Sequence, residues 1–151
     1  MMTTESQYMH EAFVEAQAAA SAGEVPIGAI AVHNGEIIGR GQNRVLRDND
    51  PTAHAEMVAM RVAALSLNNY RLTDCSLYVT LEPCAMCAGA MIHARLARLV
   101  YAASDPKAGA VTSVLQVLNH PRLNHQMAVE IGPLGDESGE LLRGFFRQRR
   151  S

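Results

Sequence analysis

The sequence predicts an α/β fold in which helices cover both faces of a β-sheet. Five short segments have the pattern of strands, five longer ones have apolar residues at helical spacing, and they follow one another as α-β-β-α-β-α-β-α-β-α. Strands that alternate with helices build a sheet covered on both sides. The chain has 151 residues, of which 48% are apolar, so we expect residues 1–151 to form one domain with a substantial core.

The first half of the chain predicts a helix, a hairpin and a second helix. Apolar residues recur at helical spacing over residues 5–21. The segments 25–32 (VPIGAIAV) and 36–41 (EIIGRG) are expected to be strands, because the Asn-Gly pair between them is a strong signal for a two-residue hairpin turn. Residues 53–67, which are rich in Ala and Met, have a helical pattern.

The second half predicts three more strands and three more helices. The strands are short apolar segments, over residues 76–81, 98–103 and 128–132. The helices are expected over residues 84–95, 111–118 and 136–149. Pro83 precedes the first of these helices, and proline is favoured at a helix start.

The charge of the chain is unevenly distributed, although its net value is only −2. No Lys or Arg precedes Arg40, and no acidic residue follows Glu140. The C-terminal segment instead carries four arginines, which are Arg143, Arg147, Arg149 and Arg150. This basic segment suggests one local contact with an anion, and the alternative is a solvated helix end favoured by the helix dipole.

The sequence has the features expected of a cytoplasmic protein. Its N-terminus lacks the basic and apolar regions of a secretion signal, and no apolar run approaches the ~18 residues of a membrane span. Three cysteines, an odd number, do not make a disulfide framework in a chain of this size, so we expect reduced thiols.

Cys84 and Cys87 lie three residues apart at an expected helix start. This spacing places both sulfurs on one helix face, and the helix start favours the thiolate, which suits either a redox pair or a metal site. His54 begins the 53–67 helix and would meet the cysteines if both helices start at the same edge of the sheet. Zinc accepts this donor set, and three protein ligands plus water are typical of catalytic zinc.

Two further residues bear on this hypothesis. Cys75 opens an expected strand and is predicted to be a core residue rather than a fourth ligand. Glu56 lies in the first turn after His54 and could move protons to and from the water that such a zinc binds. A histidine at a helix start is more often a cap, and a first-turn glutamate is more often a dipole partner. Their conjunction with Pro-Cys-x-x-Cys favours the zinc site.

Several segments resemble a known family. HAE (54–56) and PCAMC (83–87) are similar to the signature of the zinc-dependent cytidine/deoxycytidylate deaminase superfamily. Nearly the whole chain resembles the bacterial tRNA-specific adenosine deaminases, which convert the wobble adenosine of an anticodon to inosine. The segments that carry this resemblance are EVPIGAIAV, GQNRV, DPTAHAEM, NYRL, LYVTLEPCAMCAGAMIHAR, DPKAGA and FFRQRR. One departure is Ala108, where members of the family often have Thr.

The resemblance implies a three-layer α/β/α cytidine deaminase-like fold with a five-stranded mixed sheet. It implies one Zn²⁺ per subunit, held by His54, Cys84 and Cys87, with Glu56 as the catalytic proton carrier. Substrate contacts are implied for Asn43, for the backbone at Ala55, and for Asp105, Lys107, Arg149 and Arg150. Phe146 matches the RNA-facing tail, although we expect it to be a core residue.

The implied partner is a tRNA anticodon stem-loop, expected to come from an arginine tRNA with A at the wobble position, and the implied assembly is a homodimer. Two alternatives stay open. A deaminase of a free base or nucleoside, of the guanine or cytosine type, would share the zinc site and Glu56 but would not need the arginine tail. A zinc-stabilised RNA-binding module without catalysis would not need Glu56.

Overall fold

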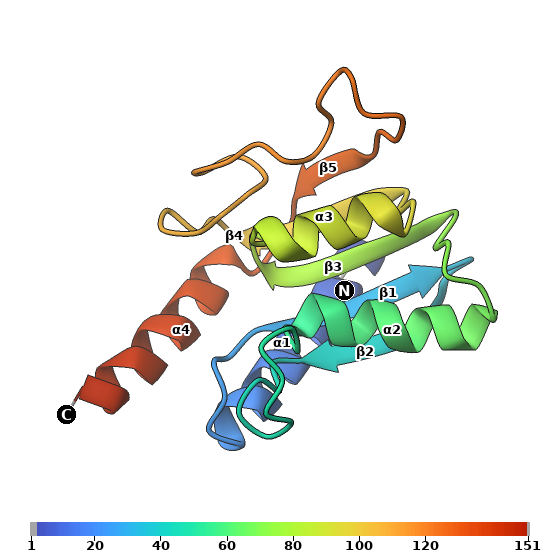
Figure 1. The fold of residues 1–151 in the computed structure, drawn as a ribbon. Helices are drawn as coiled ribbons and strands as arrows, with labels where there is room; N and C mark the ends of the chain where they lie inside the picture. Colours follow the sequence, from blue (N-terminus) through green and yellow to red (C-terminus); the bar gives the residue numbers. More distant parts are fainter. Residues whose placement is uncertain (1–2, 151) are drawn as a thin grey trace.

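The computed structural model describes residues 3–150, in which a five-stranded sheet has the order β2-β1-β3-β4-β5 (Figure 1). The strands are β1 (Gly28–His33), β2 (Glu36–Gln42), β3 (Cys75–Leu81), β4 (Arg98–Ala103) and β5 (Ala128–Ile131). β1 pairs antiparallel with β2 and β3, whereas β4 pairs parallel with β3 and β5. The mixed sheet confirms the predicted α/β class.

Helices cover both faces of the sheet, as the sequence predicts. On one face, α1 (Thr4–Ser21) packs through Met9 against Ile30 and Tyr78, and α4 (Gly135–Arg150) lies on the same side. On the other face, α2 (Ala55–Leu67) and α3 (Ala85–His93) enclose the larger core around Leu77 and Val79. Alternate residues of a strand point to opposite faces, so Leu77 and Tyr78 serve the two cores separately.

The contact between α2 and β2 is unusually close because two glycines of β2 face the helix. A Cβ atom at Gly41 would lie 2.2 Å from the carbonyl oxygen of Ala55, and one at Gly39 would lie 2.3 Å from that of Ala59. Any side chain larger than hydrogen would push the helix away. The Gly-x-Gly pattern of β2 therefore allows the first two turns of α2 to pack directly against the strand.

The strand directions bring two helix starts together. β2 and β3 are both antiparallel to β1 and therefore run in the same direction, and β4 is parallel to β3. The carboxyl ends of these three strands lie at one edge of the sheet. Since α2 follows β2 and α3 follows β3, both helices begin at that edge, which is where α/β sheets place their ligands.

The prediction of a helix over residues 111–118 is wrong, because this segment forms turns and bends. Its backbone hydrogen bonds do not follow the i to i−4 ladder of a helix. The N–H groups of Val114 and Leu115 both donate to the carbonyl of Gly109, and that of Val117 donates to Ala110. The chain turns inward here because the N–H groups of residues 111–113 donate to the buried carboxylate of Glu82.

Two smaller observations complete the fold. The strand expected over residues 25–32 begins only at Gly28, after Pro26, which has no N–H to donate to a neighbouring strand. Within residues 3–150, no helix is both long enough and apolar enough to cross a membrane.

Candidate metal centre and adjacent groove

Three ligand atoms converge at the sheet edge where α2 and α3 begin. The Nδ1 atom of His54 lies 3.6 Å from the Sγ atoms of both Cys84 and Cys87. All three atoms lie within 4.8 Å of one another, and they form the group of metal-ligating side chains found in the described part of the chain. The structure therefore brings together the three residues for which the sequence predicts zinc binding.

Helix capping explains why these side chains are available. His54 is the N-cap of α2 and Cys84 is the N-cap of α3, and both have extended backbone angles. Neither side chain makes a capping hydrogen bond to its own helix. Each instead turns toward the other helix start, and Cys87 reaches the same point from the first turn of α3.

Hydrogen bonds among the three side chains shift their pKa values. Hydrogen bonds from Cys87 and His54 lower the pKa of the Cys84 thiol to about 3. The hydrogen bond to Cys84 raises the pKa of Cys87, and burial raises it further. The hydrogen bond to Cys84 also raises the pKa of His54. A divalent cation would displace these protons and leave two thiolates and a neutral imidazole as ligands.

The spacing of the ligand atoms fits zinc. Zinc binds imidazole nitrogen at about 2.0 Å and thiolate sulfur at about 2.3 Å, so two such ligands at a tetrahedral angle stand about 3.6 Å apart. Both separations between His54 and the cysteines have this value. Cys75, which the sequence assigns to the core, is fully buried at the far end of β3, so that prediction is confirmed. The group thus offers three possible protein ligands, the number typical of a catalytic zinc.

Glu56 lies beside this group in the first turn of α2. Its side chain is only 4% exposed. Burial raises the pKa of its carboxyl to about 7, whereas a hydrogen bond from the backbone and the nearby His54 oppose that rise. A carboxyl group with a pKa near neutrality can both accept and donate a proton at physiological pH.

Asn43 follows the end of β2 and is buried. Its backbone N–H donates to the carbonyl of Ile27, and its Oδ1 accepts from the N–H of Val45, so the side chain also stabilises the turn that follows β2. The contact with substrate expected for Asn43 stays a prediction.

Two buried glutamates were not found by sequence reasoning. Glu24 accepts hydrogen bonds from the N–H groups of Leu46 and Arg47 and pairs with the Arg47 guanidinium at 3.1 Å. Glu82 holds the segment after β4 in a similar way, and its pKa falls to about 2 because hydrogen bonds from Ser113 and backbone N–H groups outweigh the effect of burial. The signal in both cases is an acidic residue next to an otherwise apolar strand, which is hard to distinguish from a solvated residue.

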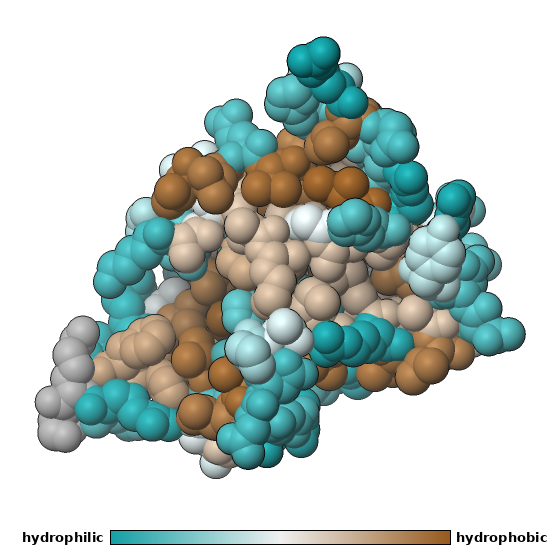
Figure 2. All heavy atoms as spheres, in the orientation of Figure 1, coloured by the Kyte–Doolittle hydropathy of each residue, from teal (hydrophilic) through white to brown (hydrophobic). Residues whose placement is uncertain are grey.

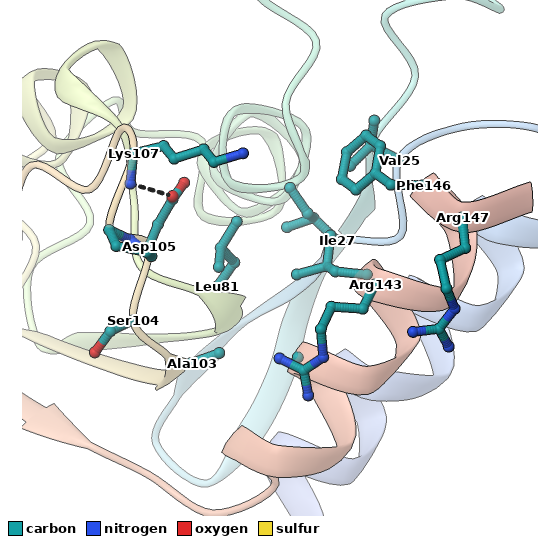
Figure 3. A pocket seen from close by; sticks show the side chains of 13 residues that line it. Val25, Ile27, Leu81, Ala103, Ser104, Asp105, Lys107, Arg143, Phe146 and Arg147 are labelled. Carbon is teal, nitrogen blue, oxygen red and sulfur yellow. Dashed lines mark hydrogen bonds between the residues drawn. The ribbon is translucent and has the colours of Figure 1, made fainter. Parts of the chain in front are cut away.

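A groove of about 690 Å³ opens at the same sheet edge, between α4 and the loop after β4. Leu81 and Ala103, the last residues of β3 and β4, form part of its floor. Figure 3 shows Asp105 and Lys107 on one side. The residues that α4 contributes to the groove are Gly139, Leu142, Arg143, Phe146 and Arg147.

The groove corrects the expectation for Phe146. Phe146 is 45% exposed and lines the groove rather than the core. The physical reason is that α4 packs on β3 and β4 and then extends past the ends of these strands, so the sheet does not cover the whole apolar stripe of the helix (Figure 1). An exposed aromatic ring among cations is a surface that can stack on a base while the cations pair with phosphate.

The arginines at the end of α4 have different environments. Arg149 donates a hydrogen bond to the carbonyl of Gly23 and lies over the Phe145 ring, with its Cζ atom 4.7 Å from the ring centroid. It ties the end of α4 to the turn after α1. The side chain of Arg150, for which the sequence predicts an RNA contact, lies outside the described residues.

Comparison with known proteins gives a consistent result over the whole chain. Residues 3–150 match the family described as MafB19-like deaminase. The tRNA-specific adenosine deaminase of Agrobacterium fabrum is 46% identical over 149 residues, which are 99% of this chain and 98% of that protein.

Two solved structures are informative. One, from a study of A-to-I editing by tRNA:A34 deaminases at the wobble position of transfer RNA, superposes with a TM-score of 0.87 at 46% identity and covers 91% of this chain and 99% of the other. A guanine deaminase from Bacillus subtilis is 44% identical with a TM-score of 0.63, but the match covers only 66% of this chain and 64% of that enzyme. The match to this particular guanine deaminase therefore spans about two thirds of each chain.

Proposed function

This chain belongs to the MafB19-like deaminase family, and from that premise we propose that it hydrolyses adenosine to inosine at the wobble position of tRNA anticodons in a zinc-dependent reaction. The observation that carries the proposal is the convergence of His54, Cys84 and Cys87 beside the buried carboxyl group of Glu56. Full-length similarity to tRNA-specific adenosine deaminases supports the choice of substrate.

His54, Cys84 and Cys87 would hold the zinc ion, one per subunit. When bound, a zinc ion with three protein ligands supplies Lewis-acid activation of a water molecule, whose pKa falls to about 7 in such sites. The overall reaction adds one water to C6 of adenine and releases one ammonia, so the chain must move protons but supplies no electrons.

Glu56 is the proton carrier in this proposal. Its carboxylate takes a proton from the attacking water and delivers it to N1 of the adenine ring. It then takes the remaining proton from the hydroxyl group added to C6 and transfers it to the amino group, which leaves as ammonia while C6 becomes a carbonyl. Its burial suits the role, because the pKa of about 7 allows Glu56 to act as a base and then as an acid. Burial also keeps bulk water away from the transfer.

Positioning of the base falls to the two helix starts and to Asn43. The N–H groups in the first turn of a helix have no partner within the helix, so the N–H of Ala55 is a donor that can face the substrate. Asn43, held at the end of β2, presents a polar side chain at the same sheet edge. We assign both to contacts with the target nucleotide.

The nucleic-acid partner is a tRNA anticodon stem-loop, and the groove beside α4 is where we place the nucleotides that flank the target. Lys107, Arg143 and Arg147 supply positive charge, and Phe146 supplies a ring for stacking. An anticodon loop is already single-stranded, so turning one base into a pocket costs little. An arginine tRNA with A at the wobble position is the expected species.

A second copy of the chain is the protein partner that we propose. Figure 2 shows tan and brown atoms over α3 and the segment beside it. Met86 and Ala90 of α3 are only partly buried, and Val114 and Leu115 are 53% and 51% exposed. A stable dimer buries about 800 Å² on each partner, and apolar surface of this kind is typical of such interfaces. Sedimentation of the purified protein would distinguish dimer from monomer.

We place the enzyme in the cytoplasm, where thiols stay reduced. Its three cysteines are all unpaired. A disulfide bond between Cys84 and Cys87 would remove two of the proposed zinc ligands.

The alternative is a deaminase of a free base, which the partial match to a guanine deaminase supports. The deciding experiment incubates the zinc-loaded protein with a synthetic anticodon stem-loop carrying A at the wobble position, and in parallel with free adenosine, guanine and cytidine. We expect inosine in the stem-loop alone. Turnover of a free base without turnover of the stem-loop would overturn the assigned substrate but keep the zinc chemistry.

A non-catalytic RNA-binding module is tested with the same substrate. Stem-loop binding without any inosine formation by the zinc-loaded protein would favour that module over an enzyme. Inosine formation that disappears on replacement of Glu56 by Ala would exclude it.

A further inference from the structure

Glu82 is a buried carboxylate to which the proposed reaction gives no role. It is 2% exposed and directly precedes Pro83 and Cys84. Its Oε1 atom accepts a hydrogen bond from the N–H of Asp105 at 3.0 Å. Its Oε2 atom accepts from three successive N–H groups, which belong to Val111, Thr112 and Ser113, at 3.1, 2.8 and 2.9 Å. The hydroxyl of Ser113 donates a fifth hydrogen bond.

Gly109 shows how closely the chain wraps this carboxylate. A Cβ atom at Gly109 would lie 2.4 to 2.5 Å from three atoms of the Glu82 carboxyl group, which are the three nearest heavy atoms. Gly109 is not among the residues with positive φ, so its backbone would accept an alanine. The space taken by the Glu82 carboxylate is therefore what requires a glycine here.

The segment that wraps Glu82 is also held by Ala110 and Val111, which are buried in the larger core, and by the Thr112 hydroxyl, which lies 2.6 Å from that of Tyr101. The residues on either side of this buried stretch, 106–108 and 112–116, are exposed. A backbone hydrogen bond also connects this segment to the start of α3, because the N–H of Ala110 donates to the carbonyl of Pro83. Asp105 and Lys107, which line the groove, belong to the same segment (Figure 3).

We propose that Glu82 is a positioning residue for RNA binding, because its carboxylate fixes the 104–113 loop to the strand end that leads into the metal-ligand helix. Through this link Asp105 and Lys107 are held at a set place relative to Cys84 and Cys87. The inference rests on the proposed function, since it assigns the loop to nucleotides flanking the target adenosine. Glu82 itself touches neither the reacting base nor the zinc.

The main test compares wild type with Glu82→Gln, which keeps the size of the side chain but turns an NH₂ group toward backbone donors. We expect KM for the anticodon stem-loop to rise about tenfold, while kcat changes less than about threefold and zinc content is unchanged. Stem-loop affinity, measured by fluorescence anisotropy in a Glu56→Ala background that cannot turn over, should fall by the same factor.

A matched control is Glu5→Gln. Glu5 also accepts charged hydrogen bonds, from Arg98, but it belongs to α1 and pairs with the first residue of β4, at the sheet edge opposite to the groove. We expect this variant to lower the melting temperature without changing KM. If Glu5→Gln raised KM as much as Glu82→Gln does, the effect would be one of general stability and the inference would fail.

Gly109→Ala gives a second route that does not depend on how Glu82→Gln folds. We expect it to raise KM in the wild-type background by displacing the carboxylate from the loop. Its added effect should largely vanish in a Glu82→Ala background, because the atoms with which the new methyl group collides are gone. Additive effects of the two changes would contradict the inference.

The outcomes distinguish failure of the proposed function from failure of the role assigned to Glu82. A wild-type protein that neither binds nor deaminates the stem-loop defeats the proposed function, whatever the variants do. A wild-type protein that does both, with Glu82→Gln and Gly109→Ala indistinguishable from it in KM and affinity, defeats only the role of Glu82. Loss of zinc in Glu82→Gln at unchanged affinity would also overturn that role.

Discussion

The Nδ1 atom of His54 lies 3.6 Å from the Sγ atom of Cys84, although 30 positions separate the two residues in the chain. The two residues meet because each is the N-cap of a helix, and because the strands that precede these helices run in the same direction. The arrangement places the candidate zinc site at the carboxyl edge of the sheet, next to the groove beside α4.

Removal of one metal ligand is expected to abolish both zinc binding and activity. Cys87→Ala leaves two ligand atoms, so we expect zinc content to fall from one per chain to near zero and turnover to fall by at least about a thousandfold. The melting temperature should also fall toward that of wild type treated with a chelator. Metal analysis measures the zinc content, and calorimetry measures the melting temperature.

Cys75→Ala is the control for this variant, because Cys75 is equally buried but belongs to the core. It should keep its zinc and lose only about 1 kcal/mol of unfolding free energy. Zinc loss in Cys75→Ala would mean that the site depends on more than its three ligands.

Glu56→Gln should separate chemistry from metal binding. The amide keeps the shape of the buried side chain but cannot accept and return a proton, so we expect kcat to fall by about 10² to 10⁴. Zinc content should not change, because Glu56 is not one of the three ligand residues. Metal analysis beside single-turnover inosine formation tests this, and near-wild-type turnover would remove Glu56 from the mechanism.

Arg98 is expected to stabilise the fold in a pH-dependent way. Its guanidinium pairs with Glu5 at 2.7 Å and Glu130 at 2.6 Å, and these hydrogen bonds lower the pKa of both carboxyl groups below the ordinary value of 4.5. A carboxyl group whose pKa is lowered on folding adds stability above pH 4.5. That stability is lost as the pH falls through the lowered value.

We therefore expect Arg98→Met to lower the unfolding free energy by about 1 to 2 kcal/mol at pH 7 and by progressively less below pH 4.5. Urea titrations over this pH range measure the difference. Arg143→Met is the control, because its pair with Glu140 is exposed and should contribute less than about 0.5 kcal/mol. A loss for Arg98→Met that does not depend on pH would show that packing, rather than charge, accounts for it.

The groove is expected to bind RNA largely through charge. The double variant Arg143→Ala with Arg147→Ala should weaken stem-loop binding and should lower the slope of log K against log salt by about 1.4, because each contact with a single strand contributes about 0.7. Arg122→Ala, in the exposed loop between β4 and β5, should leave the slope unchanged. An unchanged slope in the double variant would place the RNA elsewhere.

Some features could be predicted from sequence because they depend on neighbours in the chain. The Asn-Gly hairpin between β1 and β2, the apolar pattern of α1 and the ligand types in HAE and PCAMC all depend on contacts within a few residues. Even the meeting of His54 with the cysteines could be anticipated, since strand and helix alternation limits where helix starts lie.

Other features could not be predicted, because they depend on partners that only folding brings together. Residues 111–118 have a helical pattern, yet Glu82, 29 to 31 positions earlier, accepts the N–H groups of Val111, Thr112 and Ser113 and draws the chain into a turn. Phe146 has the spacing of a core residue, yet α4 extends past the ends of β3 and β4, which would otherwise cover it (Figure 1).

By itself, the sequence determined the α/β class, the order of the strands and helices apart from the helix expected over residues 111–118, and the chemical groups available for a zinc site. The tertiary structure alone decided which buried charges organise the loops around that site, and that the groove is lined by Phe146, Arg143 and Lys107. The physical reason is the distance along the chain between the interacting residues. Periodicity records which face of an element is apolar, whereas a buried carboxylate such as Glu82 is satisfied by N–H groups whose positions exist only in the folded chain.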